Sequence, residues 1–335
     1  MVEEIIYSME APYREKLQVR GYHFGKKEEK TACILGPIRG NEIQQLYICS
    51  QLVHALRELE HNGCINNNKG IMVIPCVNYY GMNIGKRFWP VDNTDINRKF
   101  PGMDYGDTTE RIAAGVLSAI RDYSYGIQFA SFYMTGEFVP HVRMMETGYQ
   151  NASLANLFGM PYVVVRKPRP IDTKTLNYNW QNEMTAAFSV YTNKNDEIDE
   201  TSARQAVASV LRFLMRMGII KYEGHSGYIS HVIYEENLSN VDASCGGIFR
   251  SCVKAGEEVR YNQLMGEIVD PFLGDVISEI HATTDGIVFF AHKDPLVNEG
   301  DIVFRLIHRL HARWTTCDFV YIVSGKEAAY LLLFL

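Results

Sequence analysis

The 335-residue sequence contains no closely spaced cysteine pair, no basic stretch and no long apolar run. Its seven cysteines are scattered without a C-x-x-C spacing, which favours reduced thiols in a cytoplasmic protein. A net charge of -6 argues against nucleic acid as the main partner. No segment reaches the roughly 18 consecutive apolar residues of a membrane span, and the charged N-terminus is unlike a signal peptide, so no membrane partner is expected.

Alternating strand and helix patterns occupy the first two thirds of the chain. The length predicts two domains, and 47% hydrophobic residues suffice for a sizeable core. We expect an α/β domain over residues 1–223, with an open mixed sheet covered by helices on both faces. Ligand sites in such sheets form in the loops beyond the strand ends. The predicted strands are 31–35, 71–77, 126–131, 161–166 and 186–191, and the predicted helices follow Asn41 and span 108–123 and 200–217.

The pattern changes after Gly224. Short β segments separated by Gly, Asp and Asn continue to about residue 307, and the run Gly247–Phe249 has a weak echo at Gly286–Phe289. These features predict a small all-β barrel or sandwich over residues 224–307. Residues 308–335 form an apolar C-terminal tail for which the sequence indicates no role.

The most specific motif is Asp95–Gly102, with the sequence DINRKFPG. The pair Asn97 and Arg98, with Arg87 nearby, suits a carboxylate, because a guanidinium offers a bidentate fork and an amide adds a donor. The alternative is that Arg98 pairs with Asp95 or another surface acid. The motif therefore predicts a binding site for a small carboxylate.

Two further segments accompany this motif in a fixed order. Gly36–Glu42 is a turn between a strand and a helix and ends in an acid, and Gly136–Arg143 follows a later strand. Together the three segments resemble the succinylglutamate desuccinylase/aspartoacylase family, relatives of the zinc carboxypeptidases, over about residues 30–307. The resemblance implies a zinc-carboxypeptidase-like fold followed by a biotinyl-like barrel-sandwich domain. It also implies zinc-dependent hydrolysis of N-acyl amino acids.

The resemblance also shows where this chain departs from the family. A histidine, a glutamate and a second histidine hold the zinc, and a later glutamate is the general base. Here the glutamate is kept as Glu42, but the histidine positions are Arg39 and Ala130, and the general-base position is Tyr191. No histidine lies between residues 23 and 54 or between 61 and 141. The zinc cofactor is therefore doubtful, and no catalytic residue is assigned.

The substitution at Arg39 has a physical interpretation. A buried Glu42 without its metal would be costly unless it were paired, and Arg39 lies three residues before it. We hypothesise that an Arg39–Glu42 ion pair replaces the metal–Glu42 contact. A rearranged metal site would instead use Glu42, Glu137 and His141, while His141 could alternatively contact the substrate.

Three functions remain open at this point. The first is a degenerate member that binds a small carboxylate or N-acyl amino acid through Asn97 and Arg98, with Arg87 and His141 assisting. The second is an active metal-dependent hydrolase with rearranged ligands. The third is a structural or scaffolding subunit whose pocket is vestigial. Independently of these three functions, a homo-oligomer is a candidate assembly. Loss of two ligands and the general base together favours the first function.

Overall fold

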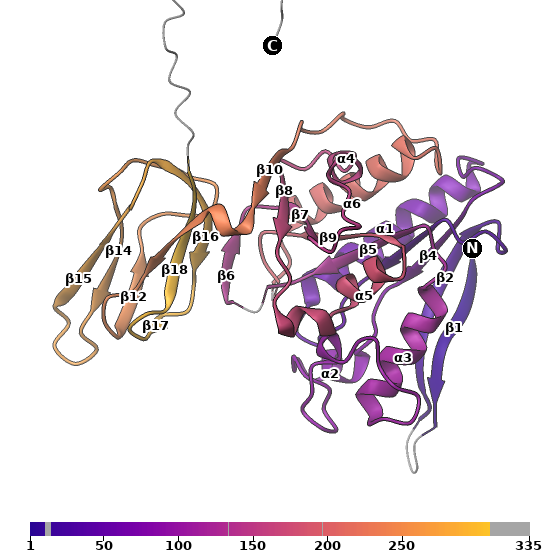
Figure 1. Ribbon diagram of the computed structural model, residues 1–335, viewed down its shortest axis with the longest axis horizontal. Coiled ribbons are helices and arrows are strands. Elements are labelled where there is room, and N and C mark those ends of the chain that lie inside the picture. Colours follow the sequence, from indigo (N-terminus) through magenta and orange to yellow (C-terminus); the bar gives the residue numbers. More distant parts are fainter. Residues whose placement is uncertain (11–14, 133, 196, 309–335) are drawn as a thin grey trace, which may run out of the picture.

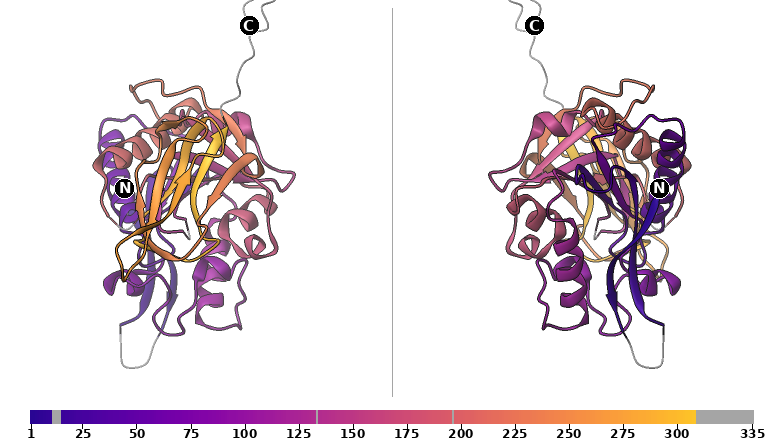
Figure 2. Two further views of the ribbon diagram at one scale, coloured as in Figure 1. Left: turned by 90° about the vertical axis from the view of Figure 1, so that its left-hand side faces the viewer. Right: turned by 90° about the vertical axis from the view of Figure 1, so that its right-hand side faces the viewer.

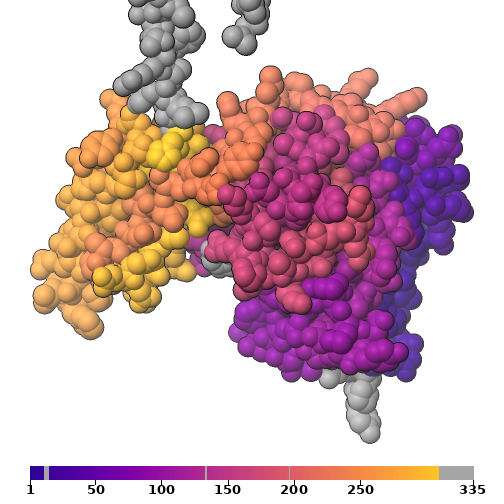
Figure 3. Space-filling model, in the orientation of Figure 1, coloured from indigo at the N-terminus to yellow at the C-terminus, as the bar shows by residue number. Residues whose placement is uncertain are grey.

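The computed structural model describes residues 1–10, 15–132, 134–195 and 197–308 (Figure 1). Apart from His308, the predicted tail over residues 308–335 lies outside the described residues. A large α/β domain and a smaller β domain lie side by side, and the smaller one forms a separate lobe in the space-filling view (Figure 3). This arrangement confirms the fold class expected from the sequence. The six cysteines among the described residues are free thiols.

The large domain is built on a nine-stranded mixed sheet. Strands β3, β4, β5 and β9 run parallel at its centre, whereas β7 pairs antiparallel with β9 and parallel with β8. The N-terminal hairpin β1–β2 forms one edge, drawn in indigo in Figure 2. In order across the sheet the strands are β1 (Val2–Met9), β2 (Leu17–Gly25), β4 (Gly70–Ile74), β3 (Ala32–Leu35), β5 (Tyr125–Ala130), β9 (Ala186–Tyr191), β7 (His141–Met145), β8 (Tyr162–Arg166) and β10 (His231–Tyr234).

Helices cover both faces of this sheet because alternate strand residues are apolar on each side. Ile34 of β3 packs with α1 (Ile43–His61), α4 (Ala152–Asn156) and α6 (Glu200–Arg216). Its neighbours Cys33 and Leu35 pack with α3 (Thr108–Ile120) and α5 (Leu176–Asn182) on the opposite face. The remaining short elements are α2 (Tyr79–Asn83) and the 3-10 turns η1 (Ile96–Arg98) and η2 (Pro170–Lys174).

The helix starts differ in detail from the prediction. Helix α1 begins at Ile43 with Glu42, not Asn41, in the capping position, and no side chain caps it. Helix α3 is capped by Asp107, whose carboxylate accepts from the backbone N–H of Glu110 in a reciprocal capping box. The Glu42 carboxylate, in contrast, accepts no capping hydrogen bond from the first turn of α1.

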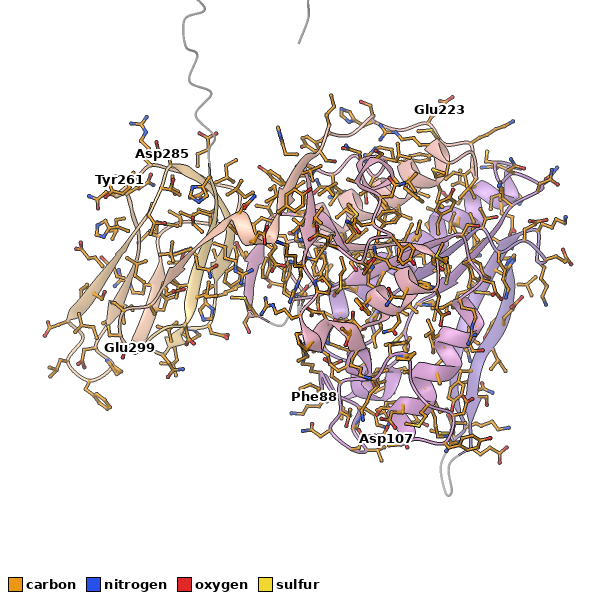
Figure 4. All side chains as sticks on the ribbon, in the orientation of Figure 1. Phe88, Asp107, Glu223, Tyr261, Asp285 and Glu299 are labelled. Atoms are coloured by element: carbon orange, nitrogen blue, oxygen red, sulfur yellow. The ribbon has the colours of Figure 1, made fainter. Side chains whose placement is uncertain are left out.

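The smaller domain packs two antiparallel sheets around a core that includes Phe249, Met265 and Phe304. The echoed segments fall on β12 and β16, which lie in different sheets. One sheet contains β15 (Val276–His281), β14 (Leu264–Val269), β12 (Gly247–Ser251) and β17 (Leu296–Val297), and the other contains β11 (Leu238–Asp242), β18 (Ile302–His308), β16 (Gly286–His292) and β13 (Glu258–Val259). In Figure 4, Tyr261 and Asp285 mark one end of this domain and Glu299 the other.

The two domains are joined by more than the connecting chain. Strand β6 (Gly136–Phe138) leaves the large domain and pairs antiparallel with β16, with Phe138 opposite Phe290. The large sheet itself continues to β10, beyond the boundary near residue 223 that the sequence pattern suggested, and η3 (Glu235–Asn237) leads into β11. None of the helices in the described ranges is long and apolar enough to cross a membrane.

Candidate functional site

A polar pocket opens on one face of the large sheet where β5, β9, β7 and β8 lie together. The strand periodicity of two explains it: Phe129 and Val190 enter the apolar core, while their neighbours Ala130, Ser189 and Tyr191 face the other side. The complete lining consists of Arg39, Asn97, Arg98, Gln128, Ala130, Ser131, Phe132, Arg143, Met145, Arg166, Asp172, Thr175, Asn177, Ser189 and Tyr191. The segments singled out in the sequence therefore converge on one cavity.

Arg39 and Glu42 form a buried ion pair at the start of α1. The Nη1 of Arg39 lies 3.2 Å from Oε1 of Glu42, and its Nε donates to Asp95 at 2.9 Å. Both side chains are at most 5% exposed. The turn is tight at Gly40, where a Cβ would lie 2.2 Å from the backbone carbon of Gly81. This close approach fixes the path of the chain beside Arg39.

The carboxylate of Glu42 is surrounded by donors. It accepts from the backbone N–H groups of Ile38 and Arg39, each at 3.1 Å, from the guanidinium of Arg39, and from the hydroxyl of Ser131. Hydrogen-bond donors satisfy a carboxylate but offer no lone pair to a cation. The residues at this position therefore do not fit the zinc of the resemblance.

The alternative ligand set is not assembled either. Glu137 of β6 forms an ion pair with Lys194. His141 is fully buried, its Nδ1 lies 2.8 Å from the carbonyl oxygen of Val139, and its ring stacks on Tyr191. Burial and the charge of Arg143 lower the pKa of His141 to about 3. Within the residues that the structure describes, no group of three His, Cys, Asp or Glu side chains could hold a metal ion. His141 is packed against Tyr191 and is not among the residues that line the pocket.

The predicted carboxylate clamp is only partly assembled. Asn97 and Arg98 line the pocket from η1, whose start is held by Asp95 accepting from the backbone N–H of Asn97. The amide oxygen of Asn97 accepts from the backbone N–H of Leu176 at 3.1 Å. The Nη1 of Arg98 donates to the carbonyl of Ile171 and lies 3.4 Å from Asp172. Both residues thus combine structural contacts with exposure to the cavity.

Arg87 stands apart from this pair. Its Nη2 lies 3.8 Å from Asp95, and it is absent from the pocket lining. Burial and the positive charge of Arg39 lower the pKa of Arg87. In this structure Arg87 therefore contacts Asp95, which also pairs with Arg39, and its role as a ligand contact stays a prediction.

Two arginines in the pocket were missed by the sequence reasoning. Arg143 of β7 stacks between the rings of Phe132 and Tyr191, with its Cζ 4.7 Å and 4.6 Å from their centroids. Burial opposes its charge, but Tyr191 and nearby acids raise the pKa of Arg143. Arg166 of β8 is bound by Asp172 at 2.9 Å. A charged residue within an apolar strand, as in HVRMM and VVVR, was the available signal.

An ion-pair chain connects the pocket to the smaller domain. Arg166 contacts Glu235 at 3.3 Å, and Glu235 in turn contacts Arg305 of β18 at 3.0 Å. Burial alone would raise the pKa of Glu235, but Arg143, Arg166 and Arg305 together lower it to about 2. Glu235 is therefore ionised at neutral pH and offsets part of the positive charge of the site.

Comparisons with known proteins agree with the motif resemblance. A model of the succinylglutamate desuccinylase/aspartoacylase catalytic domain matches residues 28–215. N-alpha-acetyl-L-2,4-diaminobutyric acid deacetylase of Halomonas elongata is 24% identical over 298 residues, covering 82% of this chain and 81% of that enzyme.

Solved structures show the same fold. A succinylglutamate desuccinylase from Silicibacter sp. TM1040 superposes with a TM-score of 0.76 at 18% identity, covering 90% of this chain and 91% of that one. The product-bound ectoine utilization protein EutE (DoeB) from Ruegeria pomeroyi gives 0.73 at 19% identity, covering 88% and 90%. At identities of 18% and 19%, these two comparisons show a shared fold and nothing further.

Proposed function

Because this chain belongs to the succinylglutamate desuccinylase/aspartoacylase family of N-acyl amino acid deacylases, we propose that it binds a small carboxylate ligand without metal-assisted hydrolysis. Asn97 and Arg98 hold the carboxylate from η1. The observation that carries the proposal is the environment of Glu42, the one zinc-ligand position of the resemblance that is kept. Its carboxylate is taken up by Arg39, Ser131 and two backbone N–H groups.

The chemistry of the pocket supports the same conclusion. Hydrolysis in the family requires an activated water and a base to move its proton. Ala130 has no side chain that could ligate a metal, and Tyr191 contacts the guanidinium of Arg143 through its ring. What remains is a polar cavity with guanidinium and amide donors, which suits recognition of an anion more than proton transfer.

Calorimetric titration with N-acetyl amino acids and simple carboxylates tests the proposal. We expect binding without product formation, and at least tenfold weaker binding in Arg98→Ala, because a charge-assisted hydrogen bond contributes about 1.5–3 kcal/mol. The matched control is Arg57→Met on the exposed side of α1. Absence of carboxylate binding by the wild-type protein would refute the proposal. So would hydrolysis that depends on added zinc.

A further inference from the structure

The smaller domain carries a group of exposed apolar side chains at one end. Phe272 is 93% exposed and Leu273 is 77% exposed, and both lie in the turn between β14 and β15. Val276 and Ile277 at the start of β15 are each exposed by nearly half, and Leu296 of β17 is 69% exposed. Single exposed apolar residues are ordinary on a protein surface, but a contiguous group of them marks an interaction surface.

The strand register makes this patch continuous across the sheet. Ile248 of β12 pairs with Leu296 of β17 on one side and with Val269 of β14 on the other. Val269 in turn pairs with Val276 of β15, so one apolar row crosses all four strands. Directly paired residues share a face of a sheet. The next residue, Phe249, belongs to the core of the domain, whereas Ile248 does not, so the row lies on the outer face.

The turn that presents the two most exposed side chains is firmly held. The carboxylate of Asp270 accepts from the backbone N–H groups of Phe272 at 2.8 Å and Leu273 at 2.9 Å. The backbone N–H of Asp270 donates to the carbonyl oxygen of Asp275 at 2.8 Å. Gly274 has a φ of +81°, in the left-handed region that favours glycine. An aromatic ring and a leucine therefore project from a fixed backbone, which reduces the entropy lost on association.

A charged row lies beside the apolar row on the same outer face. Arg250 follows Ile248 by two positions on β12 and pairs in register with Glu267 of β14. Its Nη2 lies 3.1 Å from Oε2 of Glu267, and its side chain is still 65% exposed. The two charges occupy the two middle strands of the sheet. A two-fold axis between β12 and β14 exchanges them, so the row is complementary in charge to a second copy of itself.

We propose that this outer face of the smaller domain is the interface of a homodimer. A two-fold axis parallel to the strands, between β12 and β14, packs the face of one copy on the same face of the other. The β14–β15 turn of one copy then lies over β12 and β17 of the second copy, where Phe272 covers Ile248 and Leu296. The same axis brings Arg250 against Glu267 of the second copy.

The size of the patch suits a dimer. The exposed fractions correspond to roughly 600 Å² of apolar surface in one copy, so two copies would bury about 1,200 Å², the lower end of specific interfaces. The turn between β14 and β15 lies at the outer end of the smaller domain, away from the large domain (Figure 1). Dimer formation and ligand binding in the polar pocket are therefore expected to be independent of each other.

Sedimentation velocity on the full chain tests the interface. At micromolar concentration the wild-type protein is expected to have about twice the 38.2 kDa mass of one chain. Phe272→Ser combined with Leu273→Ser should weaken dimerisation about tenfold or more, because it removes the apolar anchors. The matched control is Tyr261→Ser, which removes a 72% exposed aromatic ring near the other end of β14 and should leave the dissociation constant unchanged. Circular dichroism checks that each variant is folded.

A charge reversal tests the geometry of the dimer separately. Arg250→Glu places like charges on both sides of the axis and should also weaken dimerisation about tenfold or more. Adding Glu267→Arg restores opposite charges within and between the copies and should return the dissociation constant to within about threefold of wild type.

Two results would overturn the proposed interface. The first is a wild-type chain that stays monomeric up to about 100 µM, because a specific interface of this size would be populated at that concentration. The second is a dimer whose dissociation constant changes less than about threefold both in the Phe272→Ser, Leu273→Ser variant and in Arg250→Glu, because the copies then associate through another surface.

Discussion

Replacement of Arg39 by methionine should destabilise the large domain strongly. The substitution keeps an unbranched apolar stem but removes the guanidinium that contacts Glu42 at 3.2 Å and Asp95 at 2.9 Å. Breaking one side of a buried ion pair costs about 3–5 kcal/mol, against about 0–1 kcal/mol for an exposed pair. Because Glu42 keeps Ser131 and two backbone donors, we expect a loss near the lower end, about 3 kcal/mol.

The measurement is urea unfolding followed by tryptophan fluorescence. Trp89 and Trp180 are both buried in the large domain and report on it. The double variant Arg39→Met with Glu42→Gln should recover at least 1 kcal/mol, because the buried carboxylate that lost its partner is then gone.

A loss below 1 kcal/mol in Arg39→Met, or no recovery in the double variant, would refute the reasoning. The pair would then contribute no more than a surface contact. Stabilisation of the wild-type protein, but not of Glu42→Gln, by added zinc would also refute the reasoning, because the Glu42 carboxylate would then bind a metal and not Arg39.

Three further predictions concern the metal position and the effect of pH. Arg39→His, Ala130→His and Tyr191→Glu together should give about one equivalent of tightly bound zinc by elemental analysis after reconstitution; no gain over wild type would show that the backbone no longer supports a zinc site. The pKa of Glu235, lowered to about 2, contributes stability that is present above the unfolded pKa near 4.5 and is lost as the pH falls toward 2. Glu235→Gln should remove about 3 kcal/mol of that acid dependence in unfolding titrations, and an unchanged slope would contradict this. The pKa of buried His141, lowered to about 3, makes wild-type stability fall by about 2 kcal/mol between pH 6.5 and 4.5, because only the unfolded chain gains the proton. His141→Phe should flatten this interval, and retention of the slope would assign it to other groups.

The sequence predicted those parts of the fold in which local pattern and tertiary packing agree. Helix α6 and strand β9 match their predicted ranges within one residue, because their apolar positions follow a single period. The hairpin β1–β2 was not predicted, since charged residues such as Glu3 and Glu4 interrupt the alternation on an edge strand with one exposed face. Edge strands carry a weaker pattern because solvent, not a second layer, covers part of them.

The site could be predicted only where a motif was contiguous. Glu42, Asn97 and Arg98 were found because two short segments carry them, and the structure brings both segments together. Arg143 and Asn177 come from β7 and α5, and their meeting depends on the pairing of β7 between β9 and β8. No local pattern encodes that pairing. His141 lies on the same face of β7 as Arg143, but the rings of Phe132, Tyr191 and Phe289 pack against it, and these contacts between distant segments leave no local signal.

The pairing of β6 with β16 affects how this protein can be divided experimentally. The segment between β5 and β7, which begins near Phe132, pairs through β6 with a strand about 150 residues later in the chain. A fragment ending before β11 would lose that anchor and also Arg305, the counter-ion beyond Glu235. Such a fragment would expose the aromatic cluster around Phe138 and misplace the ring that supports Arg143. The smaller domain therefore supports this part of the large domain from outside the pocket, and the two parts should melt in one cooperative step.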